Sequence, residues 1–317
     1  CTSFRGIMTI ESIQNSGNGI AATVGFFDGV HLGHLNLIDQ LAQIAEERNL
    51  KSMVVTFPEH PRQILQTDYR PLLLSTPEDK IARLEETVAD LCFPLHFTKK
   101  LSQMNARTFM ESFLQKRLGV KALLVGHDHH FGCEKGTNIE DYKIIGNEIG
   151  MEVIGASALL YDSSPISSSR IRRALANGSI EKANEMLGYM YSISGTVVHG
   201  LQNGRKMGFP TANLGPYCDL MQRPANGVYA AIATVEGKSY PARLNIGFRP
   251  TFNGEGNRTI EAHIIDFSKD IYFQPLTLQF VSYIRPEKKF CSPSELALQL
   301  AKDKETAREI IKSKIEL

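Results

Sequence analysis

The chain of 317 residues is 42% hydrophobic and 22% charged, which is typical of a globular protein. Its 35 basic and 34 acidic side chains leave a formal net charge of +1, so the charge balance gives no reason to expect a nucleic-acid or membrane-surface partner. No apolar run reaches the length of a membrane span, and no signal-peptide pattern opens the chain. The five cysteines are scattered and form no CxxC pair, which argues against a disulfide framework or a zinc cage and favours a reducing cytoplasm.

Strands and helices are expected to alternate along the first half of the chain. Apolar and β-branched runs predict strands at 20–24, 52–57, 122–125 and 151–156. Apolar residues at helical spacing predict helices at 35–48, 78–88, 106–118 and 139–149. This alternation indicates an α/β domain with a parallel, doubly wound sheet, whose ligands bind beyond the carboxyl ends of the strands. The loops that follow the four strands are therefore expected to converge on one site.

The pattern changes in the second half. Short runs rich in Val, Ile, Thr and Tyr, separated by Gly, Pro, Asn and Asp, predict an antiparallel barrel or sandwich. These runs lie at 192–198, 227–235, 242–246, 259–267 and 276–283. A helical hairpin at 169–176 and 180–187 precedes them, and a helix at 294–312 follows. The length favours two domains, and we place their boundary near Gly188, giving domains 1–188 and 189–317.

The segment TVGFFDGVHLGH, from Thr23 to His34, joins the first strand to the first helix. At such a junction the free backbone N–H groups and the positive end of the helix dipole favour anions. His31 and His34 are three residues apart, so both can lie on one side of the first helical turn and bind phosphate oxygens. This HxGH pattern resembles nucleotidyltransferases that act on the α-phosphate of a nucleoside triphosphate. The alternatives are a simple tight turn, with histidines that are surface residues or metal ligands.

A second expected phosphate site opens the helix at 169, where the chain reads PISSSRIRR. Serine hydroxyls, helix N–H groups and guanidinium groups together bind polyanions well. The run resembles the ISSTxxR segment of HxGH nucleotidyltransferases, which holds the β- and γ-phosphates. Arg170 and Arg172 are the expected contacts, and the alternative is that the serines only cap the helix.

Two further features near the first site allow more than one interpretation. Asp28 fits either a metal or ribose contact or a turn aspartate bound to nearby N–H groups. The loop GHDHHFG at 126–132 has the residue types of a metal site, but consecutive side chains in a loop rarely converge on one ion. It is more similar to a G-x-[DN]-x-x-F-G loop that borders the nucleotide and flavin in the family named below.

In the second half, the tetrapeptide PTAN places the oxygen donors of Thr211 and Asn213 two residues apart, as a magnesium–nucleotide site requires. An ordinary capped turn is the alternative. Glu261 lies in the middle of a predicted strand, where glutamate is disfavoured. It is either a general base that takes a proton from an attacking hydroxyl or a residue of a solvated outer face.

The ordered motifs GxFDGxHxGH, ISSSRIR, GFPTAN, GVYA, NIGFRPTF and ExHIxDF resemble the bacterial bifunctional riboflavin kinase/FAD synthetases. The resemblance runs from about residue 20 to about residue 310. It implies a Rossmann-like FMN adenylyltransferase domain, followed by a six-stranded antiparallel β-barrel riboflavin kinase domain with a C-terminal helix. It also implies Mg²⁺ as cofactor and ATP, riboflavin and FMN as small-molecule substrates, with no nucleic-acid or membrane partner. No prediction follows for the oligomeric state.

The resemblance assigns roles to residues by position. The catalytic residues are His31, His34, Arg170 and Glu261, and the metal ligands are Thr211 and Asn213. Nucleotide contacts are Gly25, Phe27, Asp28, Gly29, Gly33, Gly126, Asp128, Ser168, Ser169, Arg172, Gly204, Lys206, Gly208, Phe209 and Pro210. Flavin contacts are Phe57, His60, Pro61, Phe131, Arg285 and Phe290.

Three positions depart from the family pattern. Phe26 replaces a usual asparagine, His130 a common arginine and Phe273 a usual glycine. The first departure predicts the loss of one polar contact near the nucleotide, and the third an altered turn. The alternatives to a bifunctional enzyme are a chain with one disabled activity and a flavin-binding carrier without turnover.

Overall fold

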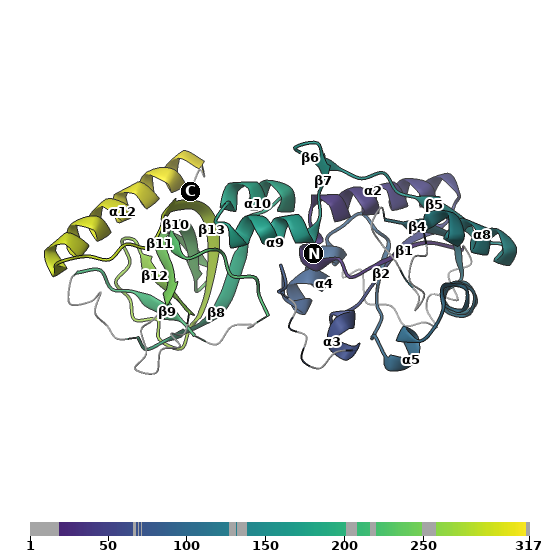
Figure 1. Ribbon diagram of the computed structural model, residues 1–317, viewed down its shortest axis with the longest axis horizontal. Helices are drawn as coiled ribbons and strands as arrows, with labels where there is room; N and C mark the ends of the chain where they lie inside the picture. Colours follow the sequence, from purple (N-terminus) through teal and green to yellow (C-terminus); the bar gives the residue numbers. More distant parts are fainter. Residues whose placement is uncertain are drawn as a thin grey trace. The chain divides into compact units, whose positions relative to one another are not determined.

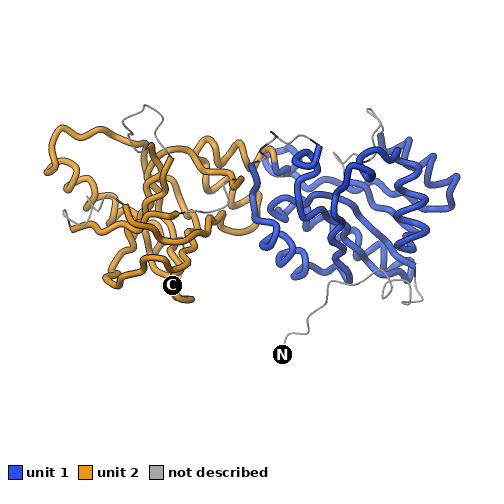
Figure 2. Tube along the Cα trace, turned by 90° about the horizontal axis from the view of Figure 1, so that it is seen from below, with its two compact units in different colours: residues 1–168 blue, residues 169–317 orange. Residues whose placement is uncertain are grey.

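The computed structural model describes residues 19–65, 68, 70, 72–126, 131, 138–200, 208–215, 220–248 and 258–314. The chain divides into two compact units, residues 1–168 and 169–317 (Figure 2). This division falls before the helical hairpin, which packs with the second unit. The expected division into catalytic domains at Gly188 stays a prediction.

The first unit is built on a five-stranded parallel sheet with the order β3-β2-β1-β4-β5 (Figure 1). Its strands are β1 (Ile20–Gly25), β2 (Lys51–Thr56), β3 (Leu91–Pro94), β4 (Val120–Val125) and β5 (Glu152–Gly155). The central strand β1 pairs with β2 on one side and β4 on the other. The chain therefore reverses its direction of winding beside β1, and an α/β sheet binds its ligand at that point. The α/β class and the four expected strands are confirmed.

Helices cover both faces of this sheet because successive side chains of β1 point to opposite sides. On one face, Ala21 packs with α2 (Leu32–Glu47) and α4 (Pro77–Glu85). On the other, Ile20 and Ala22 pack with a continuous helical segment and with α8 (Ile139–Ile149). That segment consists of α6 (Ala106–Thr108), the π-helix η2 (Phe109–Gln115) and α7 (Lys116–Leu118).

The structure adds elements that the sequence pattern did not predict. They are β3, the single turn η1 (Asp28–Val30), α3 (Pro61–Leu65), α5 (Lys99–Ser102) and a small hairpin of β6 (Leu160–Tyr161) and β7 (Ser164–Pro165). The π-helical geometry of η2 was not predicted either. Helix α4 begins as expected, because Thr76 caps it and Pro77 occupies its first turn.

The second unit is a closed barrel with the strand order β10-β11-β12-β9-β8-β13, in which every pair is antiparallel. Its strands are β8 (Ser192–Val198), β9 (Ala212–Leu214), β10 (Gly227–Val235), β11 (Lys238–Phe248), β12 (Arg258–Ile264) and β13 (Pro275–Arg285). The barrel confirms the six-stranded prediction and excludes the sandwich. The three-residue strand β9 was missed.

Among the described residues, three helices accompany the barrel. The hairpin consists of α9 (Ser168–Ala176) and α10 (Ile180–Leu187), and α10 ends at Gly188, whose φ of 81° is the left-handed cap that glycine favours. The long helix α12 (Pro293–Lys314) lies along the outside of the barrel (Figure 1). Ala307 and Ile311 of α12 pack against Ala230 and Ile232 of β10. The outer face of β10 is therefore buried beneath α12.

Candidate active sites

The turn after β1 has a strained backbone. Phe27, Gly29 and Val30 have φ angles of 54°, 76° and 41°, although Phe27 and Val30 are each only 3% exposed. A left-handed conformation at a non-glycine residue costs about 1–3 kcal/mol, and such residues cluster at functional sites. The turn ends at His31, where α2 begins.

His31 and His34 are brought together by this turn. The Nδ1 atom of His31 accepts a hydrogen bond from the backbone N–H of His34 at 3.3 Å and so caps α2. The two imidazole rings are stacked, with centroids 3.6 Å apart and an interplanar angle of 14°. Because Nδ1 of His31 accepts this hydrogen bond, the ring proton of a neutral imidazole is assigned to Nε2, which can donate to a phosphate oxygen.

At the start of this helix, the neighbours of Gly33 leave little room for a side chain. A Cβ atom there would lie 3.0 Å from the carbonyl oxygen of Ile166 and 3.2 Å from the His31 ring. The glycine therefore allows the segment before α9 to approach the start of α2 closely. Gly25, also expected to be near the nucleotide, ends β1.

Asp28 is bound to a segment that is distant in the sequence. Its Oδ1 atom accepts from the backbone N–H of Leu74 at 2.8 Å, and the carboxylate is buried. The next residue, Gly29, donates its N–H to Ser75 Oγ at 3.2 Å. Ser168 Oγ in turn donates to the carbonyl oxygen of Asp28 at 3.3 Å. The 74–75 segment and the start of α9 thus hold the turn from two sides.

The remaining phosphate residues lie on α9. Arg172 Nη2 contacts Ser169 Oγ at 3.5 Å, and Arg170 lies between them in the chain. Ser169, Arg170 and Arg172 belong to the second unit, so their expected contact with the HxGH turn stays a prediction. Gly126 follows β4 directly, and the predicted contact Asp128 and the departure His130 lie outside the described residues.

The expected flavin residues of the first unit lie around the loop after β2. Phe57 is 7% exposed, and its ring meets Phe97 edge-on at a centroid distance of 5.5 Å. His60 meets Phe26 edge-on at 4.7 Å, and Pro61 begins α3.

Phe131, the last expected flavin residue of this unit, packs against the same hydrophobic core as Phe57. Its ring stacks on Tyr142 at 4.2 Å within the hydrophobic core. Phe131 is therefore held by the core of the first unit.

In the barrel, strand pairing places three polar residues in one row. Glu261 of β12 lies opposite Asn213 of β9 on one side and opposite Asn245 of β11 on the other. Directly opposite residues of antiparallel strands share a face, so Glu261 and the expected metal ligand Asn213 are neighbours. Thr211 immediately precedes β9. A Cβ atom at Gly200 would overlap the Asn213 amide, so this glycine fixes where the amide can lie.

A cavity of about 400 Å³ borders the same two strands. Its walls include Thr211, Ala212, Ala262 and Ile264, together with the segment 267–272. Ala262 and Ile264 alternate with Glu261 along β12, so the cavity and Glu261 lie on opposite faces of the strand.

Next to the cavity, the expected nucleotide residues lie just before β9. Gly208 has a φ of 81°. The Phe209 ring meets His263 edge-on at 5.5 Å, and the carbonyl oxygen of Pro210 lies 2.8 Å from His263 Nδ1. Burial lowers the pKa of His263, so its ring is neutral and donates to that carbonyl. The expected loop residues Gly204 and Lys206 lie outside the described residues.

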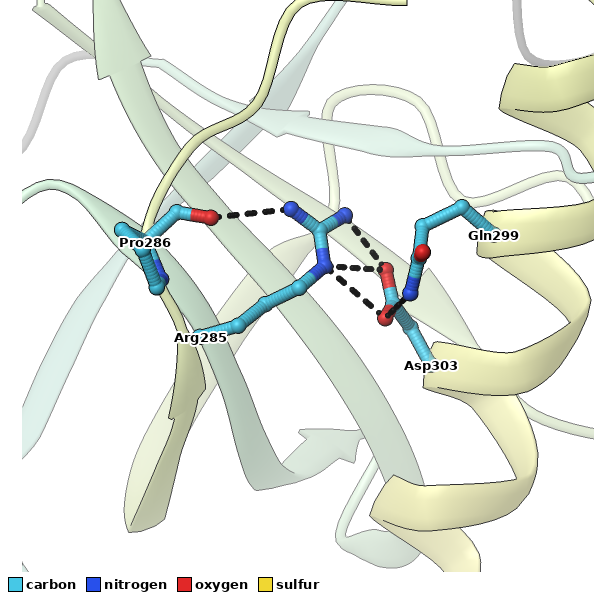
Figure 3. A network of polar contacts seen from close by, with 4 residues as sticks. All are labelled: Arg285, Pro286, Gln299 and Asp303. Atoms are coloured by element: carbon cyan, nitrogen blue, oxygen red, sulfur yellow. Dashed lines mark hydrogen bonds and ion pairs between the residues drawn. The ribbon is translucent and has the colours of Figure 1, made fainter.

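The expected flavin residue Arg285 docks α12 onto the barrel (Figure 3). Its Nε and Nη2 atoms donate to the carboxylate of Asp303, the shortest contact being 2.6 Å, and Nη1 donates to the Pro286 carbonyl at 2.9 Å. Gln299 also donates to Asp303, at 2.8 Å. The Phe290 ring centroid lies 5.9 Å from the guanidinium carbon of Arg285.

Two family models match the chain along most of its length. One, described as FAD synthetase, matches residues 13–170, and the other, described as riboflavin kinase, matches residues 187–311. The chain belongs to the bifunctional riboflavin kinase/FMN adenylyltransferase family. Relatives of that name from Haemophilus influenzae and Bacillus subtilis are each 37% identical, over 93% and 90% of this chain and 95% and 90% of their own lengths. The relative from Buchnera aphidicola is 33% identical over 96% of this chain and 97% of its own.

A solved structure also shares this fold. A Streptococcus pneumoniae protein titled macrolide-efflux protein is 31% identical and superposes with a TM-score of 0.82, covering 93% of this chain and 96% of that one. Its title names a different activity from those of the family models. Within the part of the chain that the structure describes, no helix has the length and apolar character of a membrane span.

Within the family frame, the structure points to residues that the motifs missed. Ser75 and Leu74 hold the HxGH turn, Asn245 flanks Glu261, and the segment 267–272 lines the barrel cavity. Lys80 is a further buried residue beside the first site. Asn245 lies within the NIGFRPTF motif but was given no role. The other positions act through contacts that are distant in the sequence.

Proposed function

We propose that the two reactions of flavin nucleotide synthesis use two separate sites, with the residues assigned below. The chain is a bifunctional riboflavin kinase and FMN adenylyltransferase: it phosphorylates riboflavin to FMN with ATP and adenylylates FMN to FAD with a second ATP. The observation that carries the residue assignment in the barrel is the row Asn213–Glu261–Asn245 beside a cavity large enough for a nucleotide.

In the kinase half, we assign the cavity to ATP and the opposite face of β12 to riboflavin. Thr211 borders the cavity, and Asn213, two residues further on, lies beside Glu261, so the 211–213 segment links the cavity to the Glu261 face. Glu261 takes the proton of the ribityl hydroxyl as its oxygen attacks the γ-phosphorus. The bond from the γ-phosphorus to the bridging oxygen breaks, and ADP leaves.

We assign Mg²⁺ to Thr211 and Asn213 as the kinase's metal ligands. Their hydroxyl and amide oxygens are the donors that Mg²⁺ prefers, and Asn213 is only 7% exposed and confined by Gly200, so the pair fits such an ion. The ion would supply charge neutralisation on the phosphates. No group of three or more His, Cys, Asp or Glu side chains suited to a metal occurs among the residues that the structure describes.

In the adenylyltransferase half, a phosphate oxygen of FMN attacks the α-phosphorus of ATP and the bond to pyrophosphate breaks. Little covalent chemistry is required of the protein, so positioning and charge stabilisation provide most of the catalysis. His31 donates from Nε2 to the phosphate, and the α2 N-terminus adds its dipole. Arg170 and Arg172 are assigned to the β- and γ-phosphates.

The test follows riboflavin, FMN and FAD by chromatography after incubation of the full chain with riboflavin, ATP and Mg²⁺. FMN should appear first and FAD second. Glu261→Gln should abolish FMN formation and leave FAD formation from supplied FMN, while His31→Ala should do the reverse. Asn245→Ala removes a neighbour of Glu261 but leaves the base in place, so it should lower FMN formation less than Glu261→Gln does.

If a folded Glu261→Gln or His31→Ala variant loses both activities, the assignment of two separate sites is wrong. If the unchanged chain binds flavin but consumes no ATP, it is a flavin carrier. If only one product forms, one half is disabled.

A further inference from the structure

Lys80 is a buried lysine at the end of the sheet where the loops after β1 and β2 meet. It lies on α4 and is only 2% exposed. Its ammonium group donates to the carbonyl oxygen of Phe57 and, at 3.4 Å, to that of Pro58. The same nitrogen lies 3.8 Å from the centroid of the Phe26 ring. One cation therefore joins the loop after β2 to the residue that opens the HxGH turn.

The stability of the fold alone does not explain why a charged lysine is buried at position 80. Burial of an ammonium group is unfavourable, and a hydrophobic side chain of similar length often serves a protein interior as well or better. The backbone of the two loops is already joined, because Thr56 Oγ1 donates to the Phe26 carbonyl at 3.2 Å. What Lys80 adds is a fixed position for the Phe26 ring and for the Phe57 and Pro58 carbonyls.

These contacts lie next to residues that are expected to bind the nucleotide and the flavin. Phe26 precedes the turn that ends at His31, and its ring meets His60, an expected flavin residue. Phe57, whose carbonyl accepts from Lys80, is another. We propose that Lys80 is a positioning residue of FMN adenylylation, which fixes the flavin-side loop after β2 against the nucleotide-side turn after β1. The proposal rests on the proposed adenylyltransferase function of this unit.

This role also accounts for Phe26. The family usually has an asparagine there, whose amide could accept a hydrogen bond from a lysine. In this chain the ring takes its place, and its π-face attracts the ammonium group. A cation–π contact with Lys80 thus holds the Phe26 ring in place.

The charge of Lys80 provides a readout that packing alone would not give. The groups facing it are Asp28 on η1, Glu59 in the loop after β2 and Cys92 on β3. Burial lowers the pKa of Lys80 to about 8, and the two carboxylates offset part of that effect. The ammonium form therefore predominates below about pH 8 and is lost above it.

The experiment measures kcat/KM for FMN in FAD formation across pH, for the unchanged chain, K80M and F26L. K80M should lower kcat/KM by roughly tenfold or more, because a misplacement of about 1 Å costs up to ~10²-fold. The unchanged chain should lose activity through a step near pH 8 that K80M lacks. Because both substitutions remove the same contact, the double variant should be no worse than K80M alone.

The controls separate this proposal from the function on which it rests. Lys51→Met removes an exposed lysine at the other end of β2 and should leave FAD formation unchanged. Riboflavin kinase activity of K80M should also be unchanged. If the unchanged chain forms no FAD, the adenylyltransferase assignment fails. If it does and K80M matches it across pH, the role of Lys80 is refuted. Should K80M not fold, F26L and the pH step of the unchanged chain decide the question.

Discussion

Asp303 is the residue whose replacement should disturb the barrel most, although it lies far along the chain from the expected catalytic residues. Its side chain is 2% exposed and bound to Arg285, whose own side chain is 19% exposed. Asp303→Asn keeps the volume but removes the charge, so the Arg285 guanidinium loses its counter-ion in a buried place. Breaking a buried ion pair from one side costs about 3–5 kcal/mol.

A second carboxylate offers a matched comparison. Asp266 also binds an arginine of α12, Arg308, through two hydrogen bonds of 2.9 and 3.2 Å. These side chains are 62% and 39% exposed, so solvent screens the pair, and Asp266→Asn should cost about 0–1 kcal/mol.

Urea unfolding followed by circular dichroism measures both effects, and hydrogen exchange assigns the transition to the barrel. With a slope of about 2 kcal/mol per molar, Asp303→Asn should lower the midpoint by roughly 2 M and Asp266→Asn by less than about 0.5 M. Equal shifts for the two variants, or a stabilised Asp303→Asn protein, would refute the reasoning from burial.

Three further outcomes are expected. Gly200→Ala should abolish riboflavin phosphorylation while leaving FMN adenylylation, because its methyl group would displace the Asn213 amide; loss of both activities would contradict this. Phe273→Gly should raise the free energy of unfolding by about 1 kcal/mol, since Phe273 is 69% exposed at a φ of 64°, and calorimetry should show a higher Tm. Burial tends to raise the pKa of Asp90, but hydrogen bonds from Ser52 and a lysine hold it below its usual value. Asp90 therefore stabilises the fold above its unfolded pKa, and this contribution disappears on acidification, so the acid unfolding of Asp90→Asn should be less steep.

The sequence predicted the strands well wherever the run of hydrophobic residues was long. The runs that became β1, β2 and β10 are buried over nearly their whole length, so hydrophobicity alone located them. Strand β3 has only partly buried residues, and β9 is three residues long, so neither gave a periodic signal. These two strands form because longer neighbours supply hydrogen-bonding partners, which no local pattern records.

The residues of the candidate sites were likewise predicted where a local pattern was present and missed where it was not. The spacing of His31 and His34 predicted that they share a side of the first helical turn, and alternation along a strand predicted the face of Glu261. The helix start was placed three residues late, because a histidine cap is rare and the apolar period begins only at Leu35. Lys80 could not be found, since a single lysine in a short helix is normally exposed. Its burial depends on where two distant loops meet.

The shortness of β9 links the chemistry of the kinase half to the closure of its barrel. Only two residue pairs connect β9 to β12 and two to β8, and Asn213 takes part in both ladders. The seam that completes the cylinder is therefore the same stretch of chain that is assigned to grip the metal and phosphates. A substitution in β9 is therefore expected to affect barrel closure and phosphate binding together.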